Sequence, residues 1–277
     1  MRGHPLDRAA RMFGIKDIFT TINLMGGVVG ICLCIAGRPF EAGVSIMLGY
    51  LFGDTLDGWV ARKLNSANEF GAEYDTISDH LSHVIAPAAV VFTVYKDAHL
   101  LPEPWNFALA GFLCACIIVS VSIRHARAIV QPITYKGIWT GLPRSVLGFI
   151  AIGYCNAALA PSLPGGLWIG VALIPIACVA TLGYWPFPNH HLVRGHWWFV
   201  NVAVWAFLLS SAVMIFWKPR YAFDVIAFWT IGYSLFAWLS LTREERLKHR
   251  NAVRIARGLA PVETPASPPA KEPVPAT

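Results

Sequence analysis

The chain has 277 residues, of which 56% are hydrophobic and only 14% are charged, and its formal net charge is +6. A water-soluble domain needs more charged residues to cover its surface, so this composition indicates an integral membrane protein. The positive charge gathers at the two ends and in short loops, which favours contact with anionic lipid headgroups over a nucleic-acid partner.

Apolar segments of about the length needed to cross a bilayer, roughly 20 residues, recur along the whole chain. We expect eight transmembrane helices, near residues 17–36, 43–63, 76–95, 105–123, 145–161, 166–184, 198–217 and 222–241. The predicted fold is therefore an all-α polytopic membrane bundle. Pro and Gly residues separate the fifth and sixth segments, so a count of six or seven also stays open.

The distribution of Lys and Arg predicts the orientation, because cytoplasmic loops carry an excess of both. Basic residues precede the first segment and follow the last, so we expect both termini in the cytoplasm. The predicted organisation is a cytoplasmic N-terminal segment, a transmembrane domain and a tail that is first basic and then Pro- and Ala-rich and disordered: 1–16, 17–241 and 242–277. The N-terminus has no apolar run directly after its charges, unlike a cleaved signal peptide.

Four aspartates stand within 26 residues, at the predicted cytoplasmic ends of the second and third segments: Asp54, Asp57, Asp75 and Asp79. Each pair is spaced by three or four residues and so shares one helix face. Four converging carboxylates repel one another unless cations lie between them, and oxygen ligands in this number suit Mg²⁺ or Mn²⁺. They can bridge two ions, as in phosphoryl-transfer sites.

Small residues accompany the aspartates on these faces, namely Gly58, Ala61 and Gly71. A bulky side chain there would keep a phosphate or nucleotide away from the metals. Arg62 could add a positive charge beside bound phosphates. An alternative of another class is a cation channel or carrier, but its acidic residues would be spread through the depth of the membrane.

This stretch resembles the CDP-alcohol phosphatidyltransferase family. The signature D-x2-D-G-x2-A-R-x8-G-x3-D-x3-D is matched at Asp54, Asp57, Gly58, Ala61, Arg62, Gly71, Asp75 and Asp79. The resemblance implies a membrane enzyme in which Asp54, Asp57 and Asp75 hold two divalent ions. It further implies that Asp79 approaches the metals and is the general base, and that the CDP moiety packs against the small residues.

Further patches resemble the phosphatidylserine synthase branch of that family. They are T-I-N-L-M-G-G at 21–27, N-E-F-G-A-E-Y-D-T-I-S-D-H-L-S-H-V-I-A-P at 68–87, S-I-R-H-A-R at 122–127, G-L-P at 141–143 and W-P-F-P at 185–188. The resemblance implies transfer of a phosphatidyl group from CDP-diacylglycerol to L-serine, with release of CMP. It also implies a homodimer whose active site faces the cytoplasm, in a cell or inner membrane.

The chain departs from that branch near the expected acceptor pocket. His83 and Val84 replace Phe-Gly after Ser82, the Asn expected after Ala-Arg-Phe is missing, and Ser145 replaces a Pro two residues after G-L-P. Other acceptors therefore stay open, including inositol phosphate, glycerol phosphate and an amino alcohol. An archaeal ether lipid is an alternative donor.

Serine requires a partner for its carboxylate. Arg124 and Arg127 could clamp that carboxylate or hold the lipid phosphate, although arginines in such places also serve as cytoplasmic anchors. Ser82 is a further candidate for the acceptor or the lipid phosphate. Asn23 and Thr20 on the first segment could touch the cytidine or a phosphate, or pack helices together.

Overall fold

A computed structural model describes residues 13–56, 60, 63, 69–133, 135, 137–189 and 198–262 of the chain. The first half contains α2 (Ile15–Ile35), α3 (Pro39–Gly49), the π-helix η1 (Tyr50–Asp54), α5 (Glu69–His80), the π-helix η2 (Leu81–Ile85), α6 (Ala86–Lys96) and α7 (Trp105–Val130). The second half contains β1 (Ile138–Thr140), α8 (Arg144–Asn156), η3 (Ala160–Ser162), α9 (Leu167–Leu182), β2 (Pro186–Pro188), α10 (Trp198–Trp217), η5 (Pro219–Tyr221), α11 (Ala222–Phe236), η6 (Ala237–Ser240) and α12 (Arg243–Ala256).

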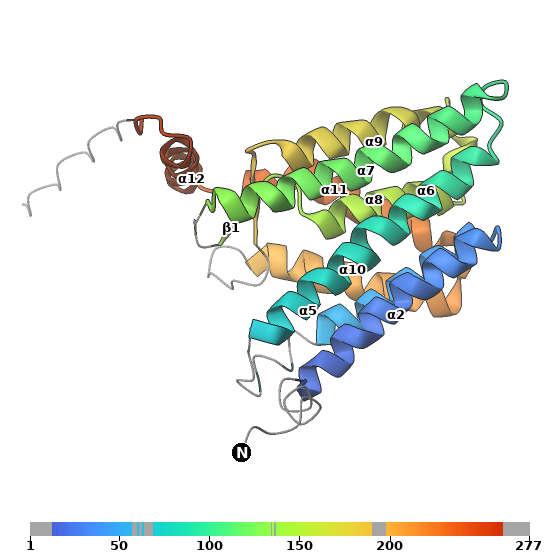
Figure 1. Cartoon of the computed structure of the whole chain (residues 1–277), viewed down its shortest axis with the longest axis horizontal. Helices are drawn as coiled ribbons and strands as arrows, with labels where there is room; N and C mark the ends of the chain where they lie inside the picture. The colour runs from blue at the N-terminus through green and yellow to red at the C-terminus, as the bar shows by residue number, and fades with distance from the viewer. Residues whose placement is uncertain are drawn as a thin grey trace, which may run out of the picture.

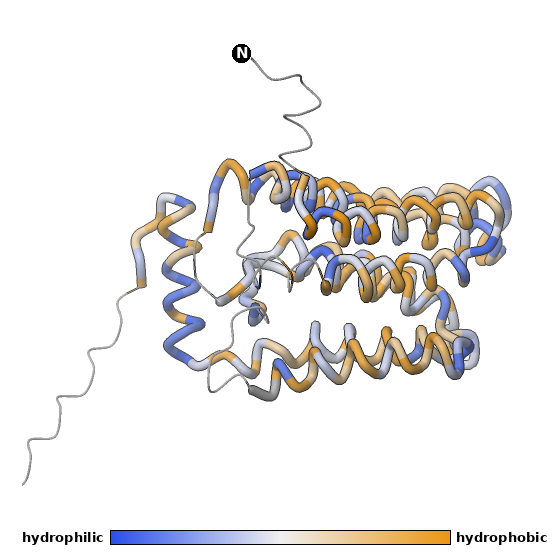
Figure 2. Tube along the Cα trace, turned by 90° about the horizontal axis from the view of Figure 1, so that it is seen from below, coloured by the Kyte–Doolittle hydropathy of each residue, from blue (hydrophilic) through white to orange (hydrophobic). Residues whose placement is uncertain are grey.

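The prediction of an all-α polytopic membrane bundle is confirmed. Each of the eight predicted segments contains a helix (Figure 1). Within the described part of the chain, five helical stretches are long and apolar enough to cross a membrane: Ile15–Ile35, Glu69–Lys96, Trp105–Val130, Val200–Trp217 and Pro219–Ser240. Figure 2 shows hydrophobic residues along the length of these helices, and many large apolar side chains are exposed, as a surface in contact with lipid requires.

Two clusters of buried apolar side chains hold the bundle together. One joins α6, α7, α8 and α9 around Tyr95, Leu113 and Ile150. The other joins α3, α6 and α8 to the last two spans through residues such as Ile46 and Phe223. Helices α10 and α11 are therefore part of the packed core.

The N-terminal ends of α2 and α5 and the C-terminal end of α7 lie toward the same end of the molecule (Figure 1). There β1 pairs with β2 in antiparallel register, with Trp139 opposite Phe187. Helix α12 lies across this end, and a capping box between Thr242 and Glu245 begins it. The sequence analysis predicted only a basic segment here; the Pro- and Ala-rich residues from 263 onward lie outside the described part.

His249 docks α12 onto the strand pair. Its ring is buried, and Nε2 lies 2.9 Å from the Thr140 hydroxyl oxygen. Burial lowers the pKa of His249 from its ordinary value of 6.5. The undocked helix then takes up a proton more readily than the docked one, so docking is fully stabilised above about pH 6.5 and weakens as the pH falls below it.

We accordingly expect faster hydrogen exchange in α12 at pH 5.5 than at pH 7.5, after correction for intrinsic exchange rates. The variant His249→Gln is the control, since its α12 protection should not change with pH. Equal pH dependence in both proteins would mean that His249 does not control the docking of α12.

Candidate active site

The Asp79 carboxylate, near the end of α5, is the centre of a buried polar cluster. The Asn23 amide on α2 donates a hydrogen bond to Oδ1 at 3.0 Å. The Arg144 guanidinium, at the first residue of α8, donates to Oδ2 at 2.6 Å. His83 Nδ1 lies 3.4 Å from Oδ1. A charge-assisted pair and an amide donor favour the ionised carboxylate, which is the form that a general base requires.

Close approach of α2 to its neighbours makes this cluster. At Gly53 in η1, a Cβ atom would collide with the Asn23 backbone, and at Gly27 one would collide with the Ser82 backbone in η2. Glycine at these two positions lets α2 reach both acidic helices, which brings Asn23 within reach of Asp79.

The helices that carry the acidic residues both contain π-helical turns. Asp54 ends η1, and His83 lies in the middle of η2, directly after the helix that carries Asp79. Such turns insert an extra residue into a helix and occur frequently at functional sites. Here they accompany the convergence of side chains from two helices.

The ligand atoms of three of these side chains, from Asp54, Asp79 and His83, lie within 4.8 Å of one another. The carboxylate oxygens of Asp54 and Asp79 suit a divalent cation such as Mn²⁺ or Mg²⁺, both of which prefer oxygen ligands. Asp75 is half-buried one turn before Asp79 on α5. The other predicted ligand and phosphate-binding residues lie outside the described part: Asp57, Gly58, Ala61 and Arg62.

The Gly71 backbone lies directly against a buried ion pair. A Cβ at this position would collide with the Lys16 ammonium and approach the Asp17 carboxylate. Lys16 Nζ and Asp17 Oδ1 are 2.9 Å apart, and both residues are buried. The face that was predicted to receive the nucleotide thus also carries Lys16, one of the basic residues that precede the first predicted segment.

The three tentative acceptor residues occupy different surroundings. Arg124 is half-buried, and its Nε and Nη2 each lie 3.4 Å from the Thr140 carbonyl oxygen. The charges of Arg124 and Arg144 also interact. Arg127 donates to the Leu182 carbonyl at the end of α9. The Ser82 hydroxyl donates to the Ser78 carbonyl on its own helix.

Two residues of the cluster had weak signals in the sequence. Arg144 directly follows G-L-P and stands beside the departure from the branch pattern at Ser145. His83 is itself one of the departures from the branch pattern after Ser82. The structure places both within ion-pair distance of Asp79.

Comparison with known proteins agrees with the site. The family model described as CDP-alcohol phosphatidyltransferase matches residues 14–183, well over half of the chain. The chain therefore belongs to the CDP-alcohol phosphatidyltransferase family, and it is an integral membrane enzyme rather than a transporter.

Three relatives are similar to this chain over more than half of its length. A protein of Methanocaldococcus jannaschii named CDP-diacylglycerol–serine O-phosphatidyltransferase is 27% identical over 76% of this chain and 88% of its own length. One of the same name from Helicobacter pylori strain J99 is 24% identical over 83% of this chain and 93% of its own. A protein of Cutibacterium acnes named phosphatidylinositol phosphate synthase is 26% identical over 64% of this chain and 83% of its own length. Two of these relatives are named for serine and the third for phosphatidylinositol phosphate, so the comparisons show the family but not the acceptor of this chain.

Proposed function

We propose that this enzyme transfers the phosphatidyl group of CDP-diacylglycerol to the hydroxyl of L-serine and releases CMP. The observation that carries the proposal is the contact between Asp79 and Arg144, 2.6 Å apart. A general base and a guanidinium side by side match an acceptor that carries a hydroxyl and a carboxylate a few atoms apart. The two relatives named CDP-diacylglycerol–serine O-phosphatidyltransferase support the same acceptor.

In the proposed reaction, Arg144 leaves Asp79 and holds the carboxylate of serine. Asp79 then accepts the proton of the serine hydroxyl, whose oxygen forms a bond to the lipid-side phosphorus of CDP-diacylglycerol. The bond between that phosphorus and the oxygen of the CMP phosphate breaks, and CMP leaves with the electron pair. Asn23 keeps the carboxylate oriented through its amide hydrogen bond.

We propose that Asp54, Asp57, Asp75 and Asp79 bind two divalent cations, Mg²⁺ or Mn²⁺. Bound there, the cations supply positive charge that neutralises the pyrophosphate and the leaving phosphate. The fit of the carboxylate oxygens of Asp54 and Asp79 to such an ion supports this assignment. The proposed surface for the CDP moiety comprises Asn23, Gly58, Ala61, Arg62 and Gly71, and Arg124, Arg127 and Ser82 remain candidates for the acceptor or the lipid phosphate.

A phosphorylated acceptor such as inositol phosphate or glycerol phosphate is the second candidate. The charge of Arg144 acts on Arg124, and this favours the second candidate, because two guanidinium groups suit a doubly charged phosphate better than a single carboxylate. The relative named phosphatidylinositol phosphate synthase points the same way.

Release of CMP by the purified protein in detergent distinguishes the acceptors. With CDP-diacylglycerol and Mn²⁺ or Mg²⁺, we expect release that depends on L-serine and stops when EDTA removes the cations. Inositol phosphate, glycerol phosphate, an amino alcohol and no acceptor are the parallel reactions, and a CDP-activated archaeal ether lipid tests the donor. Release with another acceptor but not with serine would refute the serine assignment.

We further infer that both termini and the carboxylate cluster face the cytoplasm and that the enzyme is a homodimer. The gathering of Lys and Arg at the two ends of the chain supports the orientation. Protease access to terminal tags in inside-out and right-side-out vesicles tests the topology, and light scattering of the detergent complex tests the dimer. The division into 1–16, 17–241 and 242–277 stays a prediction.

A further inference from the structure

Helix α12 carries five arginines along one side. Their spacing of three or four residues places them within roughly 80° of the helix circumference. This arginine row consists of Arg243, Arg246, Arg250, Arg254 and Arg257. Among the described residues no ion pair joins any of the five to a carboxylate, whereas Lys248 on another side of the helix pairs with Glu244. The charges of the row are therefore available to a partner.

Both ends of α12 are tied to helices that are long and apolar enough to cross a membrane. Arg243 follows the Pro219–Ser240 stretch by three residues, so it lies within about 11 Å of the end of that stretch. At the other end of α12, the Ala256 carbonyl accepts a hydrogen bond from the Gln131 side chain, directly after the Trp105–Val130 stretch. Between these points α12 runs across the ends of the spans (Figures 1 and 2). The arginine row thus follows the membrane surface for roughly 20 Å.

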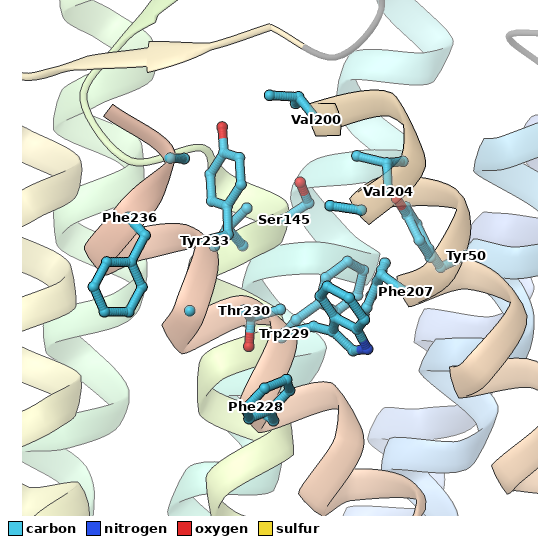
Figure 3. Close-up of a pocket in the computed structure, with 15 residues that line it drawn as sticks. Tyr50, Ser145, Val200, Val204, Phe207, Phe228, Trp229, Thr230, Tyr233 and Phe236 are labelled. Carbon is cyan, nitrogen blue, oxygen red and sulfur yellow. The ribbon is translucent and has the colours of Figure 1, made fainter. Parts of the chain in front are cut away.

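The last span is apolar on its outer surface right up to the start of α12. Figure 3 shows Phe228 and Phe236 on α11, beside the cavity between α8, α10 and α11. Their side chains are largely exposed, as are those of Trp238 and Leu239 in η6. Exposed aromatic and aliphatic side chains in a spanning helix indicate contact with lipid chains. The arginine row therefore begins where the lipid-facing surface ends.

Two arginines of the row contact aromatic rings at this end of the bundle. The Arg246 guanidinium carbon lies 5.8 Å from the centre of the Trp238 ring, and that of Arg257 lies 5.3 Å from the centre of the Tyr184 ring. Trp and Tyr side chains gather at the level of the lipid headgroups. Contact with both rings places the arginine row at that level.

We propose that the arginine row of α12 binds the headgroups of anionic phospholipids in the surrounding membrane. A guanidinium group matches the two free oxygens of a phosphodiester, and an anionic membrane surface attracts cations that lie close to it. An acidic protein or a nucleic acid would meet the same charges. The exposed Trp238 and Leu239 beside the row favour a partner that is anionic at its surface and apolar beneath it. This surface lies outside the region that the family model matches, 14–183, and does not depend on the proposed donor or acceptor.

Hydrogen exchange of the full chain in lipid nanodiscs tests the proposal. One set of nanodiscs contains phosphatidylcholine alone, and the other contains phosphatidylcholine mixed with phosphatidylglycerol. At pH 7.5 and low salt, we expect the amides of α12 to exchange about tenfold more slowly in the anionic nanodiscs, because bound headgroups stabilise the docked helix. High NaCl should remove most of this difference, since salt screens exposed charges. The amides of α6 are the internal reference and should exchange equally in both sets.

A triple variant shows whether the effect comes from the arginine row. With Arg243, Arg246 and Arg250 all replaced by Gln, exchange in α12 should differ less than twofold between the two sets of nanodiscs. The matched control replaces three cations at the opposite end of the bundle by Gln, namely Lys96 at the end of α6 and Lys218 and Arg220 ahead of α11. This control should keep the full wild-type difference.

Equal exchange of α12 in the wild-type protein in both sets of nanodiscs would overturn the proposal, and this comparison decides even if the triple variant does not fold. A difference that persists in the triple variant would also overturn it, because the anionic lipids would then act elsewhere. Polyglutamate and a DNA duplex, added to the phosphatidylcholine nanodiscs, test the other occupants. Protection of α12 by either of them but not by phosphatidylglycerol would assign the row to a soluble partner and refute the lipid assignment.

Discussion

Replacing Asp79 by Asn is expected to lower kcat by about 10²–10⁴-fold, the usual contribution of a general base. The amide oxygen can still accept the hydrogen bond from Arg144, but the side chain can no longer take the proton of the acceptor hydroxyl. Binding of the CDP-lipid should be largely retained, because the remaining carboxylates still hold the cations. The measurement is kcat from CMP release, with donor binding followed by calorimetry in the absence of acceptor.

The matched control is Asp97→Asn, at the C-terminal end of α6. The Asp97 carboxylate pairs with Lys96, and the Asp97 side chain is 62% exposed. Because an exposed pair of this kind contributes little, we expect near-normal kcat and donor affinity. Near-normal turnover by Asp79→Asn would show that another group is the base. Loss of donor binding together with turnover would assign Asp79 to the metal site alone.

The second large effect is expected for Arg144. Arg144→Ala should raise the KM for serine by about ten- to a hundredfold, since it removes a charge-assisted contact to the acceptor carboxylate. The KM for the CDP-lipid should change much less. Arg144→Lys should restore part of the loss, because lysine keeps the charge but lacks the planar pair of donors.

Arg38→Ala is the control for Arg144, because Arg38 pairs with Glu41 at 3.0 Å but is 58% exposed and outside the cluster. It should leave both KM values unchanged. A rise in the donor KM alone after Arg144→Ala would assign this guanidinium to the lipid phosphate. Unchanged KM values for both substrates would mean that Arg144 binds neither of them and only contacts Asp79.

The bundle could be predicted from sequence because lipid offers no hydrogen-bond partners, so each spanning segment must form its own helix. Hydropathy and length therefore located all eight helical segments. They could not locate α12 or the strand pair. His249 and Thr140 are 109 residues apart, and nothing in the local pattern of either segment records the contact.

The residue types of the candidate site could be predicted from the sequence, but the contacts between its side chains could not. Asp54, Asp75 and Asp79 were identified by type and spacing, since carboxylates are rarely placed in a membrane without function. Asp79 and Arg144 are 65 residues apart, so their contact depends on how α5 and α8 pack. A π-helical turn adds one residue to a helix without changing its hydropathy, so η2 and the position of His83 within it were invisible.

Helix α12 also fixes the order in which the molecule can be completed during synthesis. It is the last helix among the described residues, yet it contacts strand β1 and the Gln131 side chain just after α7, both more than 100 residues earlier in the chain. Those partners must wait until the final membrane span has been inserted. A premature stop codon ahead of Thr242 would therefore leave the five described candidate spans intact, but β1 would lack the helix that covers it.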